Sequence, residues 1–102
     1  MVVDTLIPVE PRIERAAVWL DTMASFGFAP ANWRDLIDVN TLDIRGNHRC
    51  ILGQLFGTYW TGVIRFDLSY EDCGAMGFHA ADSEWDELTH HWRRYLEQPV
   101  GV

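Results

Sequence analysis

The stretch Cys50–Tyr59 constrains the fold most, because its side chains are apolar almost all round a helix. Such a helix is buried in the centre of a domain. Gly53 and Gly57 lie four residues apart, on one face. Since each glycine costs about 1 kcal/mol relative to alanine in a helix interior, we expect close packing there to compensate. We therefore predict a central, buried helix with Asn47 as its N-cap.

Two features of this region leave alternatives open. Gln54 is polar in an otherwise apolar helix, so we expect either a buried hydrogen-bonding post or the polar rim of a groove. The following residues, Thr58–Leu68, combine β-branched and aromatic side chains with apolar residues at helical spacing. We favour a continued or broken helix over residues 58–68, and a short strand, giving an α+β fold, is the alternative.

The flanking sequence predicts further short helices. Residues 1–9 form an irregular lead-in, and a helix then starts at Pro11 and ends at Gly27 as a left-handed cap. Pro30–Ile37 is a short helix. Another helix begins with a capping box of Ser69 and Asp72 and ends at Gly77. The last helix begins in the same way at Ser83–Asp86 and ends before Pro99, and Trp92 belongs to its core stripe. The prediction is all-α: one domain, residues 1–102, of four to five short helices around the central one.

Length and charge exclude several classes. A chain of 102 residues fits one domain, and no apolar run approaches the ~18 residues of a membrane span. The two cysteines do not make a disulfide framework, so we expect a reduced, cytoplasmic protein. A net charge of −7, from 15 acidic residues and 8 arginines without lysine, argues against direct binding to nucleic acid or to anionic membranes.

Metal and catalytic patterns are missing. The chemically competent residues His48, Cys50, Cys73 and His79 do not have the paired spacing of a structural zinc site. Cys73 and His79 could form a dyad in space, but no nucleophile, phosphate-binding or dinucleotide-binding motif singles them out. We expect neither a metal nor a cofactor, and no enzymatic activity.

The net charge is local. Seven acidic residues and no arginine lie between Asp67 and Glu87, while the rest of the chain holds 8 acidic residues and 8 arginines, which cancel. Acidic residues are common in the first turns of helices, which is one explanation. The other is an acidic face that docks on a basic partner, for which the candidates are Asp82, Glu84, Asp86 and Glu87.

The aromatic content offers a second binding signal. A domain of this size rarely buries all five of its tryptophans. Trp33, Trp85 and Trp92 fit core positions. Trp19 lies one position off its helical stripe and Trp60 follows Tyr59, so these two are the candidates for exposed contacts with a partner.

The string C-x-L-G-Q-L-F-G-x-Y-x-x-G, residues 50–62, resembles a family of small uncharacterised proteins from actinobacteria and their phages. The similarity extends weakly to Trp33 and Ile37 before it, and to Gly77 and the helix around Trp92 after it. The resemblance carries no activity. It implies a phage or prophage accessory protein that binds a host protein, and it gives Gly53 and Gly57 structural roles.

Together these observations predict an accessory protein that acts by binding a host protein through an acidic and aromatic surface. The first alternative is an acidic nucleic-acid mimic that inhibits a DNA- or RNA-binding protein. The second is an enzyme or zinc protein.

Overall fold

The computed structural model describes residues 9–80 and 83–98, which form six helices and no strand. They are α1 (Val9–Ser25), α2 (Trp33–Leu36), α3 (Ile51–Phe56), α4 (Tyr59–Arg65), α5 (Tyr70–Ala75) and α6 (Trp85–Glu97). The all-α prediction is confirmed. The alternative of a strand in residues 58–68 is wrong, because α4 occupies most of that segment. The helix predicted from Pro11 already includes Val9, and residues 1–8 of the expected lead-in lie outside the described residues.

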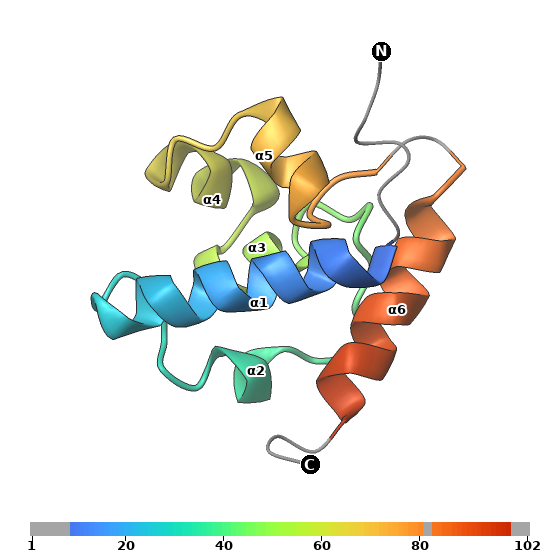
Figure 1. Cartoon of the computed structure of the whole chain (residues 1–102), viewed down its shortest axis with the longest axis horizontal. Coiled ribbons are helices and arrows are strands. Elements are labelled where there is room, and N and C mark those ends of the chain that lie inside the picture. The colour runs from blue at the N-terminus through green and yellow to red at the C-terminus, as the bar shows by residue number, and fades with distance from the viewer. Residues whose placement is uncertain (1–8, 81–82, 99–102) are drawn as a thin grey trace.

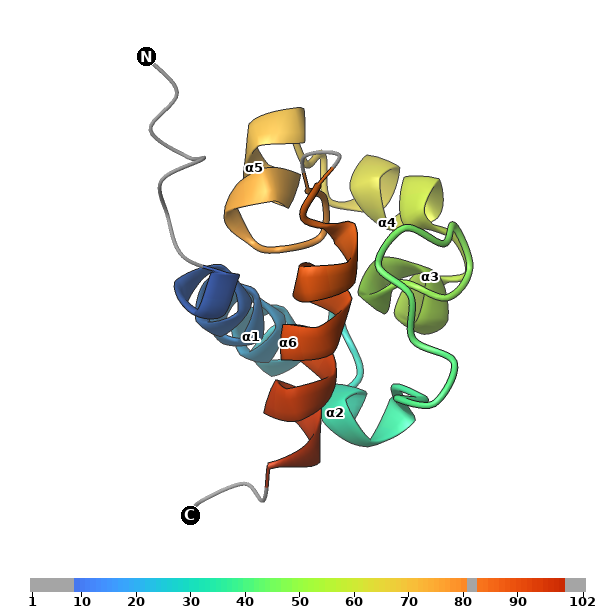
Figure 2. The same ribbon diagram turned by 90° about the vertical axis from the view of Figure 1, so that its right-hand side faces the viewer.

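The two long helices, α1 and α6, organise the domain. They pack on each other, and α1 also contacts α5, while α3 packs on α4 and on α2. In Figure 1, α4 and α5 lie on one side of α1 and α2 lies on the other. In Figure 2, turned by 90°, α6 crosses the front of the molecule, with α1 to its left and α3 and α4 to its right in the view. The core lies among these helices, and its largest fully buried side chains include Trp33, Trp92, Phe78, Ile13, Leu20, Leu42, Ile51, Leu52 and Leu88.

The central apolar stretch forms two helices rather than one, which is why six helices are found instead of four or five. Gly57 has φ +106° and ends α3, so its role in close helix packing was wrongly predicted; a Cβ there would meet nothing within 4 Å. The N-cap prediction was also wrong. Cys50 caps α3, because its Sγ accepts a hydrogen bond from the Gly53 amide at 3.2 Å.

Close packing at Gly53 is confirmed. A Cβ at this position would collide with the carbonyl oxygen of Asn47 and would lie 2.7 Å from the carbonyl carbon of His48. Contact with backbone cannot be relieved by a side-chain rotation. Glycine therefore lets the 47–48 loop lie directly against α3.

Of the two roles expected for Gln54, the structure shows the hydrogen-bonding one. Its Oε1 accepts from the Asp38 amide at 2.7 Å, and its Nε2 donates to the carbonyl oxygens of Asp38 and Arg49 at 3.2 and 2.9 Å. The half-buried side chain thus satisfies backbone groups of the loop that joins α2 to α3.

The remaining helix ends follow local chemistry with one exception. Ser69 and Asp72 form the predicted capping box, and Gly27 and Gly77 adopt positive φ of 82° and 67° after α1 and α5. The expected capping box of α6 is absent. Glu84 occupies its N-cap without a side-chain cap hydrogen bond, because its carboxylate binds Arg12 instead.

Trp92 has the structural role that was predicted. Its side chain is fully buried, and its Nε1 donates to the carbonyl oxygen of Gly77 at 2.8 Å. Its ring stacks on Phe78 with the centroids 6.2 Å apart. This contact fixes the turn after α5 against α6. Within the ranges described, no helix has the length and apolar character to cross a membrane.

Candidate functional site

Of the two tryptophans expected at the surface, one is exposed. Trp60 on α4 is 62% exposed. Trp19 is half-buried, with its ring meeting Phe66 and Phe78 edge-on at 5.0 and 5.9 Å between centroids. The expectation that Trp19 is exposed was wrong, because α4 and the turn after α5 fold over that side of α1. Its role in partner binding thereby loses its basis.

A small hollow lies beside Trp60. Its lining residues come from the loop before α3, from α4, from the turn after α5 and from the start of α6: Ile44, Arg45, Gly46, Asn47, Tyr59, Trp60, Phe78, His79 and Trp85. Ile44 and Phe78 are buried in the core, and Trp60 and Trp85 are among its aromatic lining. The hollow measures about 190 Å³. Since small-molecule sites usually measure roughly 300–1,000 Å³, this hollow fits a single side chain better than a metabolite.

Aromatic rings continue from the hollow onto the surface. The His79 ring meets Trp85 edge-on at 5.0 Å and lies 4.5 Å from the ring of Tyr70, whose hydroxyl is 2.7 Å from His79 Nε2. Tyr70 is 72% exposed. Ile64, which lies one helical turn beyond Trp60 on α4, is 76% exposed. We call the hollow together with Trp60, Ile64 and Tyr70 the aromatic surface.

The loop before α3 holds Trp60 in position. The Tyr59 amide donates to the backbone carbonyl and to the side-chain oxygen of Asn47, at 2.7 and 3.2 Å. Thr58 caps α4 by accepting from the Thr61 amide at 2.9 Å. Gly53 of α3 also packs closely against residues 47 and 48 of the same loop. Trp60 therefore projects from a helix start that is fixed on both sides.

One cation lines the hollow. Arg45 Cζ lies 5.7 Å from the centroid of the Trp85 ring, within the range of a cation–π contact. Arg45 is exposed, and its guanidinium forms no ion pair with any described residue. A cation already occupies this part of the hollow, so a second one entering from a partner would be repelled.

The buried thiols do not favour nucleophilic chemistry. Burial raises the pKa of Cys50 and that of Cys73 above the ordinary thiol value, which lowers the thiolate fraction that a nucleophile needs. Burial and a hydrogen bond with Cys73 raise the pKa of Tyr59 as well. The Cys73 thiol interacts with Tyr59, whereas His79 Nε2 lies within hydrogen-bond distance of the Tyr70 hydroxyl. Across residues 9–80 and 83–98, no three histidine, cysteine, aspartate or glutamate side chains are grouped to hold a metal.

The acidic candidates differ in their surroundings. Asp82 lies outside the described residues. Glu84 is half-buried and pairs with Arg12, while Glu87 lies 3.9 Å from His91 Nε2. Only Asp86, next to Trp85 in the chain, is exposed and unpaired among these three described carboxylates.

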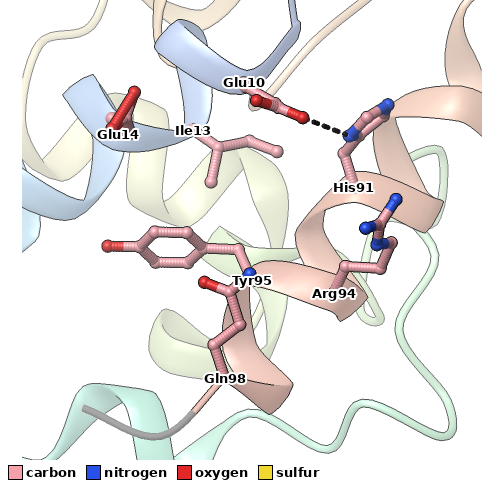
Figure 3. A pocket seen from close by; sticks show the side chains of 7 residues that line it. All are labelled: Glu10, Ile13, Glu14, His91, Arg94, Tyr95 and Gln98. Atoms are coloured by element: carbon pink, nitrogen blue, oxygen red, sulfur yellow. Dashed lines mark ion pairs between the residues drawn. The ribbon is translucent and has the colours of Figure 1, made fainter. Parts of the chain in front are cut away.

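A second hollow, also of about 190 Å³, lies between α1 and α6 (Figure 3). It is lined by Glu10, Ile13, Glu14, His91, Arg94, Tyr95 and Gln98. Its acidic side chains come from α1 and its basic ones from α6, and Glu10 Oε1 lies 3.8 Å from His91 Nδ1. We interpret it as the solvent-facing seam of the α1–α6 contact.

Sequence reasoning missed three residues of the aromatic surface. Trp85 was expected in the core because it starts the apolar stripe of α6; it is half-buried and packs against the core, and it also lines the hollow. Tyr70 and Arg45 were not singled out. Nothing in the sequence indicates the exposure of Tyr70, because the exposure of a first helical turn depends on what packs against it.

Comparisons of this chain with protein-family models, with curated proteins and with solved structures found no match.

Proposed function

We propose that this chain is a small accessory protein that acts by binding another protein through the aromatic surface. The observation that carries the proposal is the one-side-chain hollow of about 190 Å³ beside Trp60, Ile64 and Tyr70, which are 62%, 76% and 72% exposed. Exposed tryptophan and tyrosine around a small pocket are typical of the anchor region of protein interfaces. A pocket of this size does not enclose a drug-sized ligand.

The biological setting is the finer part of the proposal. The resemblance of residues 50–62 to proteins of actinobacteria and their phages supports a phage or prophage origin and a host protein as the partner, in the bacterial cytoplasm. The alternative of a nucleic-acid mimic gains little support, because Glu84, one of its four candidate carboxylates, pairs with Arg12 within the fold.

Affinity capture from an actinobacterial lysate tests the proposal. The immobilised wild-type chain is compared with Trp60→Ala and with Phe26→Ala, whose side chain is 66% exposed at the end of α1, outside the aromatic surface. We expect that the wild-type chain and Phe26→Ala retain a common protein from the lysate and that Trp60→Ala does not retain it. With that protein purified, Trp60→Ala should weaken binding roughly 30-fold or more, which is the effect of losing an interface hot spot.

Two outcomes would contradict the proposal. Equal retention by all three forms would mean that the aromatic surface is not the interface. Loss with Phe26→Ala but not with Trp60→Ala would move the interface to the far end of α1. Thermal unfolding of each variant serves as the folding control, since truncation of an exposed side chain should leave stability within about 0.5 kcal/mol.

A further inference from the structure

The hollow limits which side chain can enter it. Its floor is apolar, because Ile44 and Phe78 belong to the core. The polar His79 ring already bonds to Tyr70, and Asn47 already accepts from the Tyr59 amide. Among the described lining residues the one arginine is Arg45, whose Cζ lies 5.7 Å from the centroid of the Trp85 ring, and no lysine or carboxylate lines the hollow. An apolar side chain therefore fits, whereas a lysine or arginine would meet an existing cation.

The part of the chain that follows α4 has the opposite sign to Arg45. Residues 67–80 and 83–87 carry six carboxylates and no arginine. Glu84 pairs with Arg12, and Glu87 Oε2 lies 3.9 Å from His91 Nε2. The other four are exposed and form no ion pair with a described residue: Asp67, Glu71, Asp72 and Asp86.

Two of these carboxylates directly adjoin the aromatic surface in the chain. Asp86 follows Trp85, which lines the hollow. Glu71 follows Tyr70, whose ring contacts His79. Arg45 and Arg65 also adjoin the aromatic surface in the chain, but they are fewer than the four exposed carboxylates. The segments that carry the aromatic surface are therefore net negative. Charge complementarity favours a basic approach surface, with its greatest effect on encounter and specificity.

We infer that the partner presents a polypeptide segment in which one apolar anchor side chain, aromatic or large aliphatic, lies between basic residues. The anchor fills the hollow between Trp60 and Trp85. The flanking lysines or arginines face Asp86 on one side and Glu71 on the other. This inference rests on the proposed function and adds the chemistry of the partner.

Synthetic peptides of defined pattern test the inference directly. A central Trp, Leu or Ala is flanked on both sides by Arg, by Ser or by Glu, and each peptide is titrated into the full-length, ¹⁵N-labelled chain. The indole N–H signals of Trp60 and Trp85 report on the hollow, and those of the buried Trp33 and Trp92 serve as internal controls. We expect Trp- and Leu-centred peptides with Arg flanks to shift the indole signals of Trp60 and Trp85. The signals of Trp33 and Trp92 should stay unchanged.

The charge preference should be large and salt-dependent. At low salt, Arg-flanked peptides should bind roughly tenfold more tightly than Glu-flanked ones, and at about 1 M salt the preference should nearly disappear. The double variant Asp86→Asn/Glu71→Gln should reduce the preference several-fold. Its matched control, Asp35→Asn/Glu97→Gln, removes the same charge from α2 and from the end of α6 and should leave the preference unchanged.

The outcomes separate this inference from the proposed function. Tighter binding of Ser- or Glu-flanked peptides at the Trp60 and Trp85 signals would overturn the basic-flank inference and leave the aromatic surface as an interface. No shift of either indole by any Trp- or Leu-centred peptide would overturn the single-anchor inference. In both cases the capture experiment with Trp60→Ala still decides whether the surface binds a protein.

Discussion

Arg12 on α1 donates two hydrogen bonds to the carboxylate of Glu84, 72 residues later in the chain, at 3.1 and 3.3 Å. The Arg12 side chain is only 6% exposed and that of Glu84 is 26% exposed. The pair joins α1 to the residue that precedes α6. Glu84 therefore acts within the fold, so that its removal tests stability rather than docking.

Glu84→Gln should destabilise the domain by about 3 kcal/mol, because the buried guanidinium of Arg12 then loses the charge of this carboxylate. The partial exposure of Glu84 sets the effect at the lower end of the range for buried pairs. Urea denaturation measures it. Asp86→Asn, which changes an exposed carboxylate two residues away, should alter stability by no more than about 0.5 kcal/mol; similar losses for both variants would contradict a specific role of the pair.

Asp21 should matter mainly as an acceptor for a buried indole. Its Oδ1 accepts from Nε1 of the fully buried Trp33 at 2.9 Å, and it also pairs with Arg34. Asp21→Ala leaves that N–H without its acceptor and should cost about 1–3 kcal/mol. Asp21→Asn keeps an acceptor oxygen and should cost less than about 1 kcal/mol. Denaturation midpoints compare the two, and equal losses would mean that the charge matters more than the hydrogen bond.

The Asp21 contribution should depend on pH in the acid range. Hydrogen bonds from Arg34 and Trp33 hold the pKa of Asp21 below its ordinary value of 3.8, although burial opposes them. Because the folded state has the lower pKa, the stabilisation is complete above the unfolded value and is lost as the pH falls through the folded value.

The free-energy difference between wild type and Asp21→Asn checks this pH dependence. We expect the difference to shrink between about pH 6 and about pH 3. Asp72, whose pKa is lowered by its capping hydrogen bonds with Ser69, titrates alike in both proteins and cancels from the comparison. A difference that grows as the pH falls would show that the Asp21 carboxylate does not have a lowered pKa in the fold.

Gly53 should be intolerant of a methyl group, whereas Gly74 should not. Gly53→Ala forces a Cβ against the backbone of Asn47 and His48, and we expect a loss towards the upper end of about 1–3 kcal/mol. Gly74 lies in α5, and a Cβ there would meet nothing within 4 Å. Gly74→Ala should therefore stabilise the domain by about 0.5–1 kcal/mol through helix propensity. Thermal unfolding of both variants measures the contrast, and similar changes would refute it.

The two thiols should be unreactive in the folded chain. Cys50 and Cys73 are 2% and 1% exposed, and burial raises the pKa of each above the ordinary value of 9.0. Alkylation at neutral pH should therefore be slow in buffer and should accelerate with urea along the unfolding transition. Mass spectrometry of the labelled chain follows it. Rapid labelling of either cysteine without denaturant would contradict the buried positions.

The parts of the fold that sequence could predict depend on local chemistry. The capping box of Ser69 and Asp72 and the left-handed turns at Gly27 and Gly77 were correctly expected, because each depends on a few neighbouring residues. The cap of α3 was not, because the thiol of Cys50 replaced the expected Asn47 side chain. Asn47 instead bonds to Tyr59, twelve residues away.

The candidate site was only partly predictable for a related reason. Periodicity indicates which side of its own helix a residue occupies, but not what covers that side. Trp19 is off the main stripe of α1, yet Phe66 and Phe78 pack against it. Glu84 belongs to an acidic run in sequence, yet Arg12 holds its carboxylate. Both outcomes depend on contacts between residues more than 40 positions apart.

The sequence by itself determined the all-α class, the burial of Cys50, Ile51 and Leu52 and the close packing at Gly53, because helical periodicity and apolar composition are local properties. Only the tertiary structure decided that Trp60 and Trp85 line one hollow with Arg45 between α4 and α6. The physical reason is that this hollow is assembled by the packing of four separate segments around the core, and no single segment carries a signal for it.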